Sequence, residues 1–183
     1  MEGIIRNFEE NALPHLGAAY NLARWLTRNH TDAEDVVQEA YLRALRHFNS
    51  FHGGDCRPWL LAIVRNTCYT WLQLNRAPEL QVAFDEDLYV PEESDLSPET
   101  LLLRGSDSEL LREALEKLSP EFREIIVLRE LEELSYKQIA EVADIPLGTV
   151  MSRLARARKR LEEILKRQGS KEAAGEELIA TAP

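Results

Sequence analysis

The sequence is poor in the features that mark secreted, membrane-spanning or disulfide-stabilised proteins. Its 183 residues include only two cysteines, which cannot form a disulfide framework. No apolar run approaches the roughly 18 residues that cross a bilayer. The first residues, Met1-Glu-Gly-Ile-Ile-Arg6, lack the apolar core of a signal peptide. We therefore expect a cytoplasmic protein with no membrane insertion.

Candidate catalytic and metal-binding clusters are also scarce. Cys56 and Cys68, with His47 and His52, could suggest a zinc site, but they lack the short ligand spacings of structural zinc sites. The alternative is that Cys68 is an apolar helix residue and that the others lie on or beside a loop. Cys56 would then be either a redox-active thiol or an unreactive one. No nucleophile–base pair or Gly-rich phosphate loop is present. The sequence therefore predicts no enzyme, no metal and no cofactor.

The charge is unevenly distributed. The net charge of −10 is unusual for a nucleic-acid-binding protein, which is often strongly basic. However, residues 79–109 contain ten acids and one base, whereas residues 149–167 contain seven bases and two acids. The average over the chain therefore hides a basic segment near its end.

Periodicity and composition divide the chain into four parts. Residues 4–76 and 107–167 have helical periodicity, and neither shows the alternation of a strand. Residues 77–106 are acidic and contain three prolines and a glycine, which predicts a flexible linker. Residues 168–183 are small and polar and are predicted to form a disordered tail. The expected fold is all-α, with two small helical domains joined by this linker.

A helix is predicted from about residue 31, where Thr31 and Glu34 match a capping box. Its apolar residues fall on one face. The opposite face carries Asp35, Gln38, Glu39, Leu42 and Arg46. Leu42 lies among charges, so it is either a harmless exposed leucine or an anchor for a protein partner with a polar rim.

The next segment combines a loop, residues 49–55, with a helix from about Arg57 to Leu74. Between Arg57 and Pro78 there is no acid, and the helix contains Trp59, Tyr69 and Trp71. Arginine and aromatic side chains on one element can hold phosphates and stack on unpaired bases. The alternative is that both tryptophans belong to the core.

A helix-turn-helix is predicted between residues 135 and 165. Ser135 is the candidate N-cap of its first helix, and Ser119 is the candidate N-cap of the helix that precedes the motif. Residues 143–146 form the turn, and the second helix begins near Leu147. Its buried stripe is Val150, Leu154, Ala157, Leu161 and Leu165, and Ser152, Arg156 and Lys159 lie opposite, flanked by Thr149, Arg153 and Arg160. The basic residues of an amphipathic helix can simply be exposed to solvent, without binding DNA. With the capped helix and turn before it, the pattern favours binding in a DNA major groove.

Two stretches resemble the sigma-70 superfamily, specifically its extracytoplasmic-function (ECF) group of sigma factors. Residues 32–45, followed by Phe51 and residues 59–66, resemble conserved region 2. Residues 134–158 resemble region 4. Both motifs, in this order and with this linker, are highly specific.

The resemblance implies a role for each group of residues. The face with Leu42 would bind the β′ clamp helices of core RNA polymerase. Promoter −10 DNA would be bound by Asn49, Ser50, Phe51, His52, Trp59, Arg65, Asn66 and Tyr69. The −35 element would be contacted by Arg129, Thr149, Ser152, Arg153, Arg156, Lys159 and Arg160. The polymerase β flap and an anti-sigma factor are further expected partners, and the polymerase performs the chemistry.

Some positions depart from the family pattern, and other functions compete. Thr70 replaces a common acid, the segment after Leu72 lacks a dense basic run, and Met151 and Ala155 stand where larger or basic residues are frequent. One rival is an autonomous helix-turn-helix repressor, which leaves the first domain unexplained. Another is a sigma mimic that only titrates an anti-sigma factor, against which the intact basic face argues.

Overall fold

The structure is a computed structural model that describes residues 2–75 and 105–180, with side chains for 5–75 and 110–168. All regular secondary structure in these ranges is helical, which confirms the predicted all-α class. The N-terminal half comprises α1 (Glu2–Ala12), η1 (Leu13–His15), α2 (Leu16–Thr27), α3 (His30–His47), η2 (Phe48–Ser50) and α4 (Cys56–Asn75). The C-terminal half comprises α6 (Gly105–Glu116), α7 (Pro120–Ile126), the π-helical η5 (Val127–Leu131), α8 (Tyr136–Ala143) and α9 (Leu147–Ala180). The predicted linker lies outside the described residues, apart from its last two positions, which begin α6.

The N-terminal half is a bundle in which α2, α3 and α4 pack against one another. The predicted apolar face of α3 is confirmed, since Val37, Ala40 and Ala44 are buried. The predicted cap is wrong: Asn29 is the N-cap, and its side chain accepts a hydrogen bond from the Asp32 amide at 3.1 Å. Asn29 has extended backbone angles, as an N-cap requires, whereas Thr31 is already within the helix.

The C-terminal half contains the predicted helix-turn-helix. Ser135 caps α8 in a full capping box with Gln138, as the sequence predicts. Helix α8 ends at Ala143, and the left-handed backbone of the next residue, Asp144 (φ 53°), turns the chain before α9. The stripe on α9 is buried at Val150, Leu154, Ala157 and Leu161, and half-buried at Leu165.

Helix α9 continues to Ala180, so it includes residues 168–180 of the predicted tail. These residues contain three alanines and three glutamates, which favour helix, together with two glycines.

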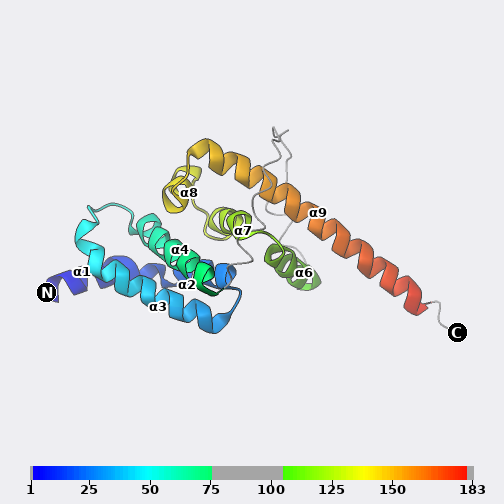
Figure 1. Ribbon diagram of the computed structural model, residues 1–183, viewed down its shortest axis with the longest axis horizontal. Helices are drawn as coiled ribbons and strands as arrows, with labels where there is room; N and C mark the ends of the chain where they lie inside the picture. The colour runs from blue at the N-terminus through cyan, green and yellow to red at the C-terminus, as the bar shows by residue number, and fades with distance from the viewer. Residues whose placement is uncertain (1, 76–104, 181–183) are drawn as a thin grey trace.

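The two halves pack on each other. Helix α4 lies against α8, and α2 lies against α7, so that α7 is held between the N-terminal bundle and α9 (Figure 1). One cluster of buried apolar residues runs through both halves, from Leu22 and Val64 to Ile139 and Leu154. The joint between them places α4, the helix with predicted −10 residues, beside the helix-turn-helix.

Candidate functional site

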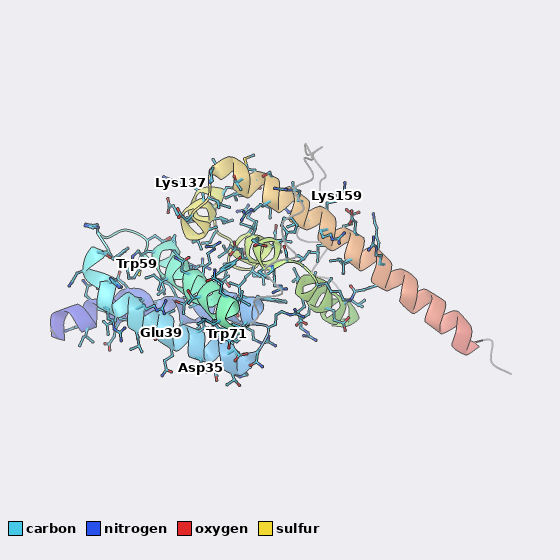
Figure 2. All side chains as sticks on the ribbon, in the orientation of Figure 1. Asp35, Glu39, Trp59, Trp71, Lys137 and Lys159 are labelled. Atoms are coloured by element: carbon cyan, nitrogen blue, oxygen red, sulfur yellow. The ribbon has the colours of Figure 1, made fainter. Side chains whose placement is uncertain are left out.

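The predicted polymerase-binding face lies on the outer side of α3. Asp35, Gln38 and Arg46 are exposed, and Glu39 is half-buried in an ion pair with Arg43 (2.7 Å). Leu42 is 46% exposed. Figure 2 shows Asp35 and Glu39 on the side of α3 that points away from α8 and α9. This face is therefore open while the two halves are packed together.

A groove between α2 and α3 continues this face. Leu16, Gly17 and Tyr20 of α2 line it, together with Asp35 and Gln38 of α3. Leu16 is 46% exposed, although it begins a helix whose other side is buried. The sequence analysis did not predict that α2 lines this groove. The available signal was that apolar residues of α2 fall on more than one side of the helix.

Residues 49–55 and the start of α4 bring together part of the predicted −10 set. Asn49, Ser50 and His52 are exposed. Half-buried Phe51 and Trp59 have ring centroids 5.3 Å apart, and both rings contact buried Phe48. Trp59 is thus packed at the edge of a small core, while part of its side chain stays accessible.

Arg65 and Tyr69, from the same predicted set, lie elsewhere on α4 and face the C-terminal half. Arg65 donates two hydrogen bonds to the Glu124 carboxylate of α7, Nε to Oε2 at 2.8 Å and Nη2 to Oε1 at 3.1 Å. Its guanidinium also lies over the Tyr69 ring, 4.4 Å from the centroid. The Arg65 side chain is 15% exposed and that of Glu124 is fully buried. Asn66, by contrast, is exposed.

Burial and mutual attraction change the pKa values of Arg65 and Glu124. Complete burial raises the pKa of the Glu124 carboxyl, and the Arg65 charge offsets part of that effect. Burial disfavours the Arg65 cation, but attraction and hydrogen bonding to Glu124 together raise the pKa of its guanidinium. The arginine therefore keeps its charge, and the pair remains a directed, bidentate contact.

The predicted −35 residues lie on α9, apart from Arg129. Thr149, Ser152, Arg153 and Arg156 are half-buried, whereas Lys159 and Arg160 are exposed. Arg156 Nε donates to the Ser152 carbonyl at 3.4 Å, and Arg160 pairs with Glu163 at 3.1 Å. These side chains follow one another along the first turns of the second helix, which is the part that enters a major groove.

Arg129 is placed differently from the other predicted −35 residues. It lies in η5, where its Nη1 donates to the Leu134 carbonyl at 2.8 Å and its guanidinium lies 5.1 Å from the centroid of the Tyr136 ring. These contacts hold the segment that leads into α8. Arg129 therefore supports the position of the helix-turn-helix.

Both cysteines are buried. Burial raises the pKa of each thiol, most strongly for Cys68, which disfavours the reactive thiolate. Among the residues that the structure describes, no three His, Cys, Asp or Glu side chains gather where they could hold a metal ion. In the same part of the chain no helix is long and apolar enough to cross a membrane.

Comparison with known families identifies both halves. The sigma-70 region 2 model matches residues 13–77, and the sigma-70 region 4 model matches residues 108–161. The chain is 33% identical to the ECF RNA polymerase sigma factor SigE of Mycolicibacterium smegmatis over 91% of this chain, but spans 65% of that relative's length. It is 35% identical to the ECF RNA polymerase sigma-E factor of Haemophilus influenzae, over 77% of each chain.

A solved structure shares the fold. The sigma factor RpoE from Bartonella quintana, crystallised with the anti-sigma factor NepR, aligns with a TM-score of 0.65 and 31% identity. The alignment covers 88% of this chain and 98% of RpoE, so it includes both helical halves.

Proposed function

Because the chain belongs to the ECF group of the sigma-70 family of RNA polymerase sigma factors, we propose that it docks on core RNA polymerase and directs initiation at promoters with its own −10 and −35 elements. The observation that supports the proposal most is that an exposed leucine with polar neighbours on α3 and a basic helix-turn-helix occur in one chain. The face around Leu42 supplies an apolar anchor with a charged rim. It would bind the β′ clamp helices, and the C-terminal half would contact the β flap.

The two DNA-binding roles are proposed for separate surfaces. Ser152, Arg153 and Arg156, with their neighbours on α9, would read and hold the −35 duplex. Asn49, Ser50 and His52, beside the Phe51–Trp59 pair, would capture the melted −10 strand, since aromatic rings can stack on bases that have left the duplex. The chain would act in the cytoplasm, where the polymerase is.

We also propose an anti-sigma factor as a regulator. The support is the similarity to RpoE, which was crystallised with the anti-sigma factor NepR. An anti-sigma factor would have to block the outer face of α3, the basic face of α9, or both.

Run-off transcription tests the central proposal. Purified chain and bacterial core polymerase are incubated with a library of genomic promoter fragments, and the transcripts are sequenced. We expect discrete start sites that require the chain, with weak duplex binding by the chain alone. Tight, specific duplex binding without polymerase would instead support a repressor. Core binding without any transcript would support a sigma mimic.

A further inference from the structure

The first two turns of α9 expose two large apolar side chains. Leu147 is 50% exposed and Met151 is 53% exposed. The two residues are four positions apart, so their side chains lie next to each other on one side of the helix. Neither belongs to the core cluster of the described residues, which α9 joins from Val150 onward. Packing of the fold therefore does not explain why these two positions are apolar.

The space around the Leu147–Met151 pair is open. Figure 1 shows the start of α9 at the edge of the molecule, beside α8. Gly148, between the two residues, is exposed, and a β-carbon placed on it would have no heavy atom within 4 Å beyond its chain neighbours and its own helix backbone. A glycine on an open helix face lets another molecule come close to the backbone. The pair can therefore contact a ligand without rearrangement of the fold.

The two sides of this part of α9 differ in charge. With 100° between successive residues, Arg153 lies on one side of Ser152 and Met151 lies on the other. Arg158 shares the Met151 side, but it is half-buried and its Nη2 donates to Glu130 Oε1 at 2.6 Å. The charge of Arg158 is therefore directed at the protein. The Met151 side thus presents apolar groups to the outside, next to the basic face of the same helix.

The chemistry of a DNA major groove gives such an apolar pair a ligand. Arginine and lysine bind phosphates and the acceptor atoms of guanine, whereas the C5-methyl group of thymine is the apolar group that the groove displays. An apolar side chain gains nothing from a phosphate, which needs water or a cation around it. It gains from a methyl group, because their contact removes apolar surface from water. The ligand that fits the Leu147–Met151 pair is therefore a thymine methyl group.

We propose that Leu147 and Met151 contact C5-methyl groups of thymines in the −35 element and determine part of its sequence. The inference rests on the proposed function, in which α9 holds the −35 duplex. It adds a preference for thymine beside the pair, which Ser152 and the arginines do not supply, since hydrogen bonds do not recognise a methyl group. Met151 suits this role because its unbranched, polarisable side chain adapts to the surface that it covers.

Replacement of thymine by uracil isolates this contact, because uracil forms the same hydrogen bonds and lacks only the methyl group. The probe is a promoter duplex found in the run-off assay, prepared with thymine or with deoxyuridine throughout the −35 element. Filter binding of the holoenzyme at fixed salt gives the ratio of the two dissociation constants. We expect the wild-type chain to bind the thymine probe roughly fourfold more tightly for each methyl group that it contacts.

Substitutions then assign the preference to the pair. In Leu147→Ala and Met151→Ala the preference for thymine should fall, and in the double variant the two probes should bind equally. Met151→Leu keeps an apolar side chain and should keep most of the preference. The matched control is Leu131→Ala, because Leu131 is 45% exposed but lies in η5, outside α9. Each ratio compares two probes with one protein, so a change in polymerase affinity cancels.

Circular dichroism verifies that each variant keeps its helical content, and Met151→Leu keeps the test valid if an alanine variant fails to fold. Equal binding of the two probes by the wild-type chain would overturn the inference. So would an unchanged preference in the double variant, or a mapped −35 element without an A·T pair. These outcomes all occur with a chain that directs transcription, so they are distinct from failure of the transcription assay, which would overturn the proposed function itself.

Discussion

The outer face of α3 and the inner face of α4 belong to the same bundle but meet different surroundings. On α3, Leu42 is nearly half exposed, and the charged residues around it point into solvent. On α4, Arg65 is 15% exposed and bonded to a fully buried carboxylate from the other half. The chain thus leaves one of its proposed binding surfaces open and covers part of the other.

A molecule could contact the outer face of α3 without disturbing the packing of the halves, whereas Arg65 is covered as long as the halves are packed. The following three changes test this contrast, from the largest expected effect to the smallest.

Arg123 links the C-terminal half to α2 on the covered side. Its guanidinium is buried and donates to four carbonyls, those of Leu115, Glu116 and Leu118 near the end of α6 and that of Trp25 on α2. Arg123→Met fills similar space but leaves these acceptors without that donor, so we expect a loss of roughly 3 kcal/mol or more in the free energy of unfolding. Urea denaturation followed by circular dichroism measures the loss. Arg112→Met, at an exposed position of α6, is the control and should change stability by less than about 0.5 kcal/mol. Equal effects of the two changes would mean that the buried hydrogen bonds of Arg123 contribute little to stability.

Leu42 tests the open side. Leu42→Asp places a charge at the centre of the proposed apolar anchor, and loss of such a residue costs about 2 kcal/mol or more, equivalent to roughly 30-fold in affinity for core polymerase. Surface plasmon resonance with immobilised core polymerase measures the affinity. The matched control is Leu74→Asp, since Leu74 is 80% exposed near the end of α4. If Leu42→Asp binds as well as Leu74→Asp, the docking face lies elsewhere on the bundle.

Arg156 tests a third proposed surface, the basic face of α9 in the C-terminal half. Arg156→Ala removes one proposed phosphate or base contact on α9, so we expect about 1–3 kcal/mol weaker binding of the holoenzyme to promoter DNA. If the contact is to phosphate, the salt dependence of the binding constant should fall by about one charge. Filter binding over a range of salt concentrations gives both values. Lys166→Ala, further along α9, should leave them unchanged.

Local signals in the sequence predict much of the fold and of α9. The Ser135 cap, the turn near residue 144 and the apolar stripe from Val150 to Leu161 involve residues within a few positions of one another. Hydrogen bonds and helical periodicity act over just such distances, so these features are readable from one sequence. The sequence does not identify the cap of α3, because Asn29 and Thr31 are both competent caps and only backbone geometry distinguishes them.

The contact between α4 and the C-terminal half was not predictable in the same way. Arg65 and Glu124 are 59 positions apart, so no helical period relates them. One signal was available: Arg123 and Glu124 stand within the apolar run Phe122 to Leu128, where charged side chains must find buried partners. It shows that a partner is needed, but the identity of that partner depends on how the halves pack.

Gln138 links the starts of two helices in different halves. Its side-chain oxygen accepts from Ser135 at the start of α8, while its amide nitrogen donates to Asp55 Oδ2 at 3.0 Å. Asp55 in turn accepts from the Arg57 amide in the first turn of α4, also at 3.0 Å. Fraying of either helix end therefore weakens the other, which couples their melting. While the halves remain packed, the chain should unfold as a single cooperative unit, although it carries two conserved regions.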